Sequence, residues 1–245
     1  MNVSIPGRRL VFPFLIVGLI AASVRADLTH RYSFNEGAAK DSAGKVDANL
    51  KGDAKITGGQ LVLQNTDKGS DDAKLSYLEF SGPILPKTGS VSIVLWFTAK
   101  DTGGFARLVN IGDKEGSEGR AFIYFTPKNG DGQSRAAITA TDTASKTLID
   151  GDALDDGKEH CVAIVIDGTA KKLHVFVDGK EPAAAQDLGE NMLDKVRQVN
   201  NWIGKSSFDQ DPGLSASINE FRVYDEALTL EKVGAIQKAG ADKLP

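Results

Sequence analysis

Two carboxylates, those of Glu79 and Glu220, lie well inside predicted strands. Hydrolysis of a glycosidic bond needs two carboxyl groups that flank the bond, about 5 Å apart for a retaining mechanism and about 6.5–9.5 Å apart for an inverting one. Two acids on alternate positions of one strand meet that need most simply. Glu79 and Glu220 are on separate strands, so we expect Glu79 to face solvent and Glu220 to pair with Arg222 or another nearby arginine.

Other side chains that could do nucleophilic chemistry are few. The three histidines, His30, His160 and His174, lie in or at the start of predicted strands, where a structural or surface role is expected. The one cysteine, Cys161, lies in an apolar run, which indicates a small core side chain and allows no internal disulfide. Serine-hydrolase, zinc-protease and phosphate-loop motifs are absent from the sequence. We therefore predict that the protein is not an enzyme.

Aromatic side chains could bind a ligand, because ligand sites are lined by aromatic and apolar side chains with a few polar groups. Trp96 lies in a strongly apolar segment and Trp202 precedes another, so core packing is expected for both. Phe105 and Phe208 instead lie in segments rich in Gly, Ser and Asp. These two phenylalanines are the candidate ligand-binding residues.

The N-terminus has the pattern of a secretory signal peptide. Arg8 and Arg9 precede the apolar run Val11–Ala22, and Val24 and Ala26 are small residues at the positions that a signal peptidase reads. We predict cleavage after Ala26, which leaves residues 27–245 as one domain in the periplasm, in the cell envelope or outside the cell. The alternative is an uncleaved membrane anchor, for which the run is shorter than the usual minimum of about 18 apolar residues. After cleavage we expect no membrane insertion.

The charge balance limits the kinds of partner that the protein can bind. The chain has 29 Lys and Arg against 33 Asp and Glu, a formal net charge of −4 at pH 7, and removal of residues 1–26 would make it more acidic. An acidic surface argues against nucleic acid and anionic membranes as partners. The oligomeric state is left open.

Apolar patterning predicts an all-β fold. The run Cys161–Ile166 is apolar at every position, so both faces of this strand must be covered. Asp167 and Gly168 lead to a second run, Leu173–Val177, which predicts a hairpin in the middle of the fold. Ser90–Thr98 is another long strand, and further short strands follow at regular spacing. The pattern predicts a two-sheet antiparallel β-sandwich of the jelly-roll type.

The C-terminal third adds one helix. Thr229 can cap a short helix over Leu230–Lys238, whereas Ala183–Gln198 fits either a short helix or irregular chain. Strict alternation along Ser217–Tyr224 would place Ile218 on the same face as Glu220.

Four motifs, in order, resemble a known family. They are HRYSFNEG with DSAG (30–37 and 41–44), SVSIVLWF (90–97), the hairpin CVAIVID and LHVFVDG (161–167 and 173–179), and SINEFRVYDEAL (217–228). Together they resemble the laminin-G-like jelly rolls of bacterial proteins in the concanavalin A-like lectin/glucanase superfamily. The resemblance implies that the entry strand lies near the closing strand. The glucanases of this superfamily carry a Glu-x-Asp-x-x-Glu strand, and Glu-x-Asp does not occur in this sequence.

The resemblance also implies a calcium site where the entry loop meets the closing strand. Its ligands would be Glu36 or Asp41 together with Asn219, which stands where the family usually has Asp and lacks the charge that calcium prefers. The alternative is that these residues cap turns and that no cofactor is bound.

Three functions stay open. The resemblance and the missing carboxylate pair favour a secreted, non-catalytic binding module for a carbohydrate or a cell-surface glycoprotein. A structural component of the envelope or matrix, without a glycan site, is the first alternative, and a polysaccharide-active enzyme is the second.

Overall fold

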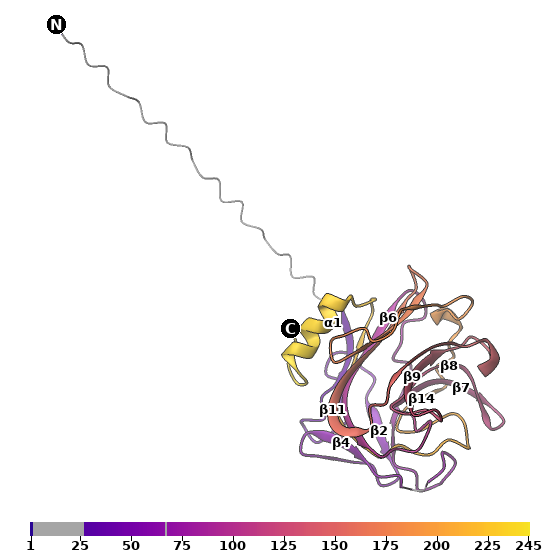
Figure 1. Cartoon of the computed structure of the whole chain (residues 1–245). Coiled ribbons are helices and arrows are strands. Elements are labelled where there is room, and N and C mark those ends of the chain that lie inside the picture. The colour runs from indigo at the N-terminus through magenta and orange to yellow at the C-terminus, as the bar shows by residue number, and fades with distance from the viewer. Residues whose placement is uncertain (2–26, 67) are drawn as a thin grey trace.

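Two antiparallel sheets pack face to face, which confirms the predicted β-sandwich (Figure 1). The computed structural model describes residue 1, residues 27–66 and residues 68–245. Apart from residue 1, the predicted signal peptide 1–26 lies outside the described residues. No helix in the described ranges is long and apolar enough to cross a membrane.

The eight-stranded sheet has the order β13-β12-β11-β6-β15-β4-β3, and β1 also pairs with β15. Its strands are β1 (Leu28–Tyr32), β3 (Lys55–Thr57), β4 (Gln60–Leu63), β6 (Val91–Lys100), β11 (Asp156–Asp167), β12 (Lys172–Val177), β13 (Gln186–Asp187) and β15 (Ala216–Tyr224).

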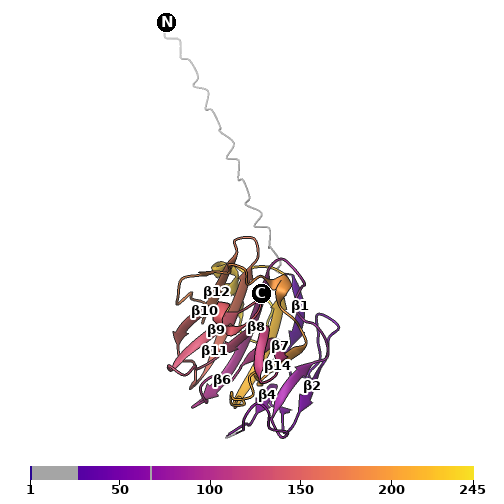
Figure 2. The same ribbon diagram turned by 90° about the vertical axis from the view of Figure 1, so that its right-hand side faces the viewer.

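The seven-stranded sheet has the order β10-β9-β8-β7-β14-β5-β2. Its strands are β2 (Ala48–Lys51), β5 (Tyr77–Phe80), β7 (Val109–Glu115), β8 (Glu118–Thr126), β9 (Gln133–Ile138), β10 (Thr147–Asp152) and β14 (Asn200–Ile203). Figure 2 looks onto its outer face. The remaining elements are two 3-10 turns, η1 (Thr143–Ser145) and η2 (Leu193–Lys195), and one α-helix, α1 (Leu230–Ala239).

Strand β11 is central and covered on both faces, as its apolar run predicts. The side chains of Val162, Ile164 and Ile166 enter the core between the sheets. Those of Cys161, Ala163 and Val165 point outward into a second apolar cluster that includes residues of α1. Burial on both sides explains why the run Cys161–Ile166 of this strand contains no polar residue.

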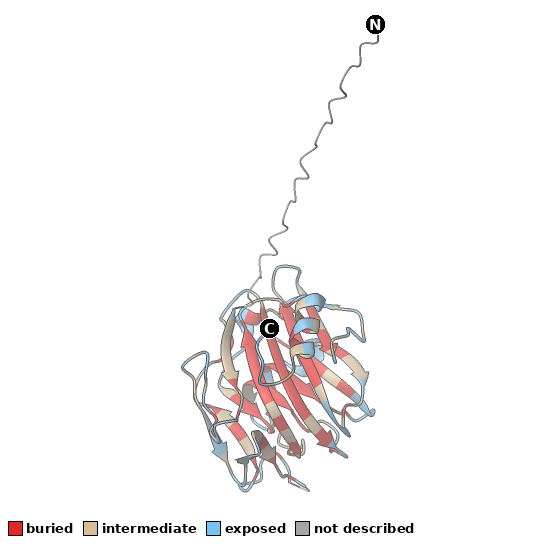
Figure 3. Ribbon diagram, turned by 90° about the vertical axis from the view of Figure 1, so that its left-hand side faces the viewer, coloured by how far each residue is buried: buried red, intermediate tan, exposed pale blue. Residues whose placement is uncertain are grey.

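Helix α1 supplies that outer cover (Figure 3). Thr229 accepts a hydrogen bond from the Lys232 backbone N–H at 3.3 Å, which confirms the predicted N-cap. Val233 and Ile236 pack on the sheet, whereas Leu230 is 49 % exposed. The helix therefore closes the outer side of the eight-stranded sheet with a narrow apolar stripe.

The predicted alternation along β15 is wrong at one point. Its pairing with β6 has a bulge between Ile218 and Glu220. A bulge adds one residue to a strand and so changes which side chains share a face. Ile218 therefore faces the core together with Phe221, while Glu220 lies on the outer face with Arg222.

The entry strand lies beside the closing strand, as the jelly-roll resemblance implies. Strand β1 pairs with β15, with Tyr32 opposite Phe221.

The ambiguous segment Ala183–Gln198 forms only β13 and η2. Gly189, with φ of +56°, interrupts a helix there because left-handed backbone cannot continue a right-handed turn.

Candidate functional site

A row of side chains crosses the outer face of the seven-stranded sheet. Strand neighbours of these residues, such as Ile123 and Ala136, face the core, so the alternate positions face outward. In cross-strand register the row reads Leu148, Ala137, Tyr124, Asn110, Trp202 and Glu79. Aromatic and polar side chains thus lie side by side on this face, where Asn110, Tyr124 and Trp202 are themselves buried.

The loop 205–213, which follows β14, folds back over this face. Ser207 accepts a hydrogen bond from the Asn110 side chain at 2.8 Å. The Phe208 ring meets the Phe122 ring edge to face, with centroids 5.7 Å apart. Asp209 forms an ion pair with Lys114 of β7. These contacts fix the loop, and with it Phe208, against the sheet.

Phe105 and Phe208, the two aromatic residues predicted to bind a ligand, lie on either side of one arginine. The Cζ atom of Arg107 is 5.3 Å from the centroid of the Phe105 ring and 5.6 Å from that of the Phe208 ring. It is 3.7 Å from the ring centroid of Tyr124, which lies beneath it on β8. We call Phe105, Arg107, Tyr124, Phe208 and Asp211 the arginine–aromatic cluster. Both phenylalanines are half-buried, so part of each ring faces solvent.

The charge at the centre of the cluster is buried. Arg107 is 3 % exposed, and its Nη2 is 2.9 Å from a carboxylate oxygen of Asp211. Its Nε and Nη1 have no hydrogen-bond partner within the described part of the chain. Burial lowers the pKa of Arg107, an effect that the Asp211 charge opposes. Burial likewise raises the pKa of Asp211, while Arg107 and Ser206 act to lower it.

A second arginine extends the cluster. Arg135 on β9 holds Asp150 of β10 through two hydrogen bonds, of 2.5 and 2.8 Å. Its Cζ is 5.8 Å from the Phe105 ring centroid.

Reasoning from sequence found the two phenylalanines but missed Arg107, because Arg107 is the first residue of a predicted strand and was not considered as a binding residue. The signal was present, because Phe105 and Arg107 are at alternate positions and can share a face.

Asp41, a predicted calcium ligand, has its carboxylate occupied by hydrogen bonds. Its oxygens accept from the backbone N–H groups of Gly44 and Val46 at 2.8 and 3.0 Å and lie 2.6 Å from His30 Nδ1. Burial alone would raise the pKa of Asp41, but these contacts, with one from the Arg31 backbone, hold it below its ordinary value. The carboxylate acts as the cap of a turn.

The other two predicted calcium ligands lie apart from this turn. Glu36 is exposed. Asn219 donates from its side chain to Glu159 of β11 at 2.8 Å. No hydrogen bond joins Glu36, Asp41 and Asn219 in the described ranges, and those ranges contain no group of three or more His, Cys, Asp or Glu side chains able to hold a metal ion. Calcium binding stays a prediction.

The two strand carboxylates belong to different sheets. Glu79 of β5 is bound by Lys51 at 2.8 Å on the outer face of the seven-stranded sheet and is half-buried. Glu220 is fully buried on the outer side of the eight-stranded sheet and pairs with Arg31 and Arg222, as expected for an arginine partner. The core of the sandwich separates the two groups. They cannot flank one glycosidic bond.

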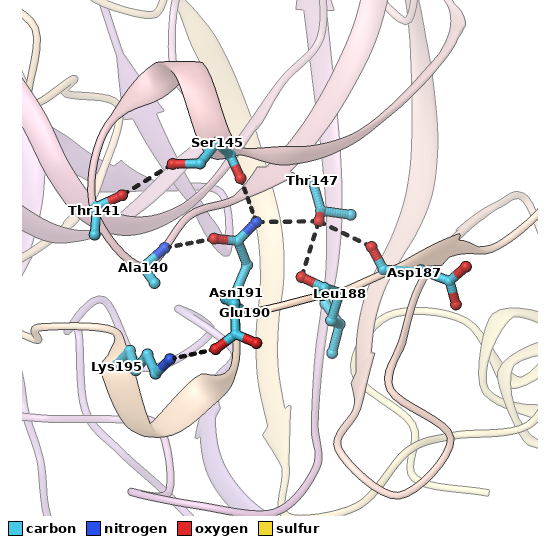
Figure 4. A pocket seen from close by; sticks show the side chains of 10 residues that line it. Ala140, Thr141, Ser145, Thr147, Asp187, Leu188, Glu190, Asn191 and Lys195 are labelled. Carbon is cyan, nitrogen blue, oxygen red and sulfur yellow. Dashed lines mark hydrogen bonds and ion pairs between the residues drawn. The ribbon is translucent and has the colours of Figure 1, made fainter.

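A hollow of about 780 Å³ opens near the end of the β9–β10 hairpin (Figure 4). Asn191 ties its walls together, accepting from the Ala140 backbone at 2.9 Å and donating to Thr147 at 3.2 Å. Lys195 pairs with Glu190 at 3.2 Å. Most of its lining residues are polar, none is aromatic, and several of their polar groups hydrogen-bond to one another. The full lining is Ala140, Thr141, Ser145, Thr147, Asp187, Leu188, Gly189, Glu190, Asn191 and Lys195.

Comparison with known families gives one match. Residues 72–234 match the model of a family described as the concanavalin A-like lectin/glucanases superfamily. No curated protein matches the sequence.

Solved structures share the fold. A botulinum neurotoxin type C structure, concerned with cell entry through two ganglioside molecules, superposes with a TM-score of 0.65 at 11% identity over 87% of this chain and 51% of that one. Domain 4 of the arabinanase AbnA from Geobacillus stearothermophilus, in complex with arabinotriose, gives 0.56 at 19% identity, over 86% of this chain and 98% of that one.

A third similar structure is the CBM40 domain of the Ruminococcus gnavus IT-sialidase, bound to α2,6 sialyllactose. Its TM-score is 0.52 at 20% identity, over 61% of this chain and 84% of that one. The chain spans about half the length of the botulinum neurotoxin chain, 51%. At these identities the likeness extends to the fold alone.

Proposed function

The chain belongs to the concanavalin A-like lectin/glucanase superfamily, and on that basis we propose that it is a carbohydrate-binding module whose sugar site is the arginine–aromatic cluster. The observation that carries the proposal is the convergence of Phe105 and Phe208 on Arg107. Two half-buried rings offer an apolar face for a pyranose, and the buried guanidinium of Arg107 lies between them.

The backbone of Phe105 supports the same assignment. Its φ is +67°, in the left-handed region that large side chains rarely adopt. Such a conformation costs about 1–3 kcal/mol and persists where the surroundings hold it, most often at ligand sites. A hydrogen bond from the Phe105 N–H to the Lys128 carbonyl, 2.7 Å long, holds it here.

Similar structures support carbohydrate as the ligand class. The arabinanase domain and the CBM40 domain were solved with arabinotriose and sialyllactose, and the neurotoxin structure concerns gangliosides. A saccharide, free or on a cell-surface glycoprotein, is therefore the ligand we propose for this chain.

We propose further that the module is non-catalytic and exported. The separation of Glu79 from Glu220 on opposite sides of the sandwich supports the first point, since each carboxylate has a cationic partner of its own. The signal pattern in residues 1–26 supports export to the periplasm, the cell envelope or the exterior. A reducing-sugar assay on any polysaccharide that binds should show no release above background.

A glycan array with the protein, run with calcium and with a chelator, tests the function and the calcium prediction together. Calorimetry on the best glycan then compares the wild type with F105A and F208A. Loss of one ring contact should weaken binding about tenfold, which corresponds to roughly 1.4 kcal/mol.

Leu230→Ala is the matched control. Leu230 is also apolar and 49 % exposed but lies on helix α1, over the other sheet, so this variant should bind like the wild type. An array without a bound glycan, or equal affinities for wild type, F105A and F208A, would contradict the proposal.

A further inference from the structure

A lysine on the same outer face lies over two aromatic rings. The Nζ atom of Lys205 is 4.8 Å from the ring centroid of Tyr77 and 4.8 Å from that of Trp202. The two rings meet edge to face, with centroids 6.0 Å apart. Trp202 is on β14, two strands from Tyr124 of β8, so this group is separate from the arginine–aromatic cluster.

The fold holds this lysine in place through the preceding glycine. Gly204 has φ of +92°, and a Cβ atom there would clash with Leu63. Only glycine fits this backbone conformation and this close approach without strain. The turn directs the chain from β14 onto the outer face, where Lys205 is half-buried against the rings.

The ammonium group of Lys205 has no direct ion-pair partner among the described residues. No ion pair or hydrogen bond of its ammonium group occurs in the part of the chain that the structure describes, whereas its neighbour Lys114 is paired with Asp209. Glu79, on the same face, is already bound by Lys51 at 2.8 Å and by the Trp202 indole N–H at 3.4 Å. Burial, together with the charge of Lys114, lowers the pKa of Lys205, while the carboxylates of Asp71, Asp209 and Glu79 act to raise it. The Lys205 Nζ atom itself is accessible to solvent.

We propose that Tyr77, Glu79, Trp202 and Lys205 form a second binding site, specific for the acidic group of a saccharide. An ammonium group has three donors and attracts an anion as a point charge, so a carboxylate or sulfate of the ligand would supply a direct ion-pair partner. The site adds to the proposed function and uses none of the residues of the arginine–aromatic cluster.

The other groups of the site select a sugar over a free anion. The Tyr77 ring is half-buried and offers apolar surface for a pyranose ring, with the Trp202 ring, 8 % exposed, packed beside it. The Glu79 carboxylate accepts hydrogen bonds from hydroxyl groups. The same carboxylate lies near enough to repel a ligand of high anionic density. A singly charged acidic unit within a chain therefore suits the site better than a phosphate ion.

Calorimetry with three probes on the full-length protein tests this site. The probes are sialyllactose, a trisaccharide of galacturonic acid and a sulfated disaccharide, and the esterified forms of the first two serve as neutral references. At least one acidic probe should bind more tightly than its neutral form, and Lys205→Met should weaken that binding about tenfold. Lys205→Arg, which keeps the charge, should retain most of the affinity.

Control variants separate this site from the proposed one. Lys172→Met removes a lysine that pairs with Asp187 at 2.8 Å on the other sheet and should leave affinity unchanged. F105A and F208A should retain the preference for the acidic probe, while Lys205→Met should retain binding of neutral glycans. The inference is overturned if no acidic probe exceeds its neutral reference, or if Lys205→Met binds the acidic probe as the wild type does.

Discussion

The guanidinium of Arg31 binds both carboxylate oxygens of Glu220, with Nε 2.7 Å from Oε1 and Nη2 3.1 Å from Oε2. The pair joins β1 to β15. Glu220 also accepts from Arg222, which is fully buried, and from the Asp242 backbone N–H at 2.5 Å. One carboxylate thus holds the first strand, the last strand and the segment after helix α1 together, which is a structural role.

The substitution E220Q should destabilise the fold strongly. The amide keeps the shape of the side chain but leaves the buried guanidinium of Arg222 without its counter-charge, which costs about 3–5 kcal/mol. Urea unfolding measures the change. The matched control is E190Q, because Glu190 is 94% exposed and pairs with Lys195 at the surface, where a pair contributes about 0–1 kcal/mol. Equal losses in both variants would show that the network around Glu220 adds nothing.

Asp41 should contribute to stability in a pH-dependent way. Its folded pKa is below the ordinary value of 3.8, because hydrogen bonds to the ionised form outweigh the effect of burial. A carboxyl with a depressed folded pKa stabilises the fold fully above the unfolded pKa, and that contribution is lost as pH falls through the folded pKa. D41N should therefore be less stable than wild type at pH 7, and the gap should narrow below about pH 4.

Thermal unfolding of both proteins across pH 2–8 checks this, with D53N as the control, since Asp53 is 75% exposed. If the difference in stability between D41N and wild type stayed constant with pH, the negative charge of Asp41 would not be what stabilises the turn.

Gly119 should control the position of the Phe208 ring. A Cβ atom at Gly119 would lie 2.6 Å from Cε2 of Phe208, so the ring must move in G119A. The moving atom is the tip of a half-buried side chain, and we expect the fold to survive while glycan affinity falls several-fold. G234A is the control: nothing lies within 4 Å of its added Cβ, and on helix α1 it should add about 1 kcal/mol of stability. Unchanged glycan affinity in G119A would remove Phe208 from the site.

Cys161 should be inert in the folded protein. It is 4 % exposed, and burial raises the pKa of its thiol to about 12. The thiolate is the reactive form, so a thiol-specific reagent at pH 8 should label the protein only after denaturation. Labelling of the native protein within minutes would show that helix α1 opens readily from the sheet.

The sequence by itself determined the sandwich and its central strands. Apolar side chains at every position of Cys161–Ile166 require cover on both faces, whatever supplies it. The hairpin that follows and the cap at Thr229 are likewise local, because turn and cap residues act within a few positions of themselves. The same local reasoning marked Phe105 and Phe208 as aromatic residues in polar loops.

Only the tertiary structure decided which side chains meet. The bulge between Ile218 and Glu220 depends on the pairing of β15 with β6, and alternation within one strand cannot reveal it. The partners of Arg107 come from loops and strands that the sheet order brings together, and the Arg31–Glu220 pair joins the two ends of the domain. Local patterns set the faces of each strand, whereas contacts between distant segments depend on strand order and register, which no single stretch of sequence encodes.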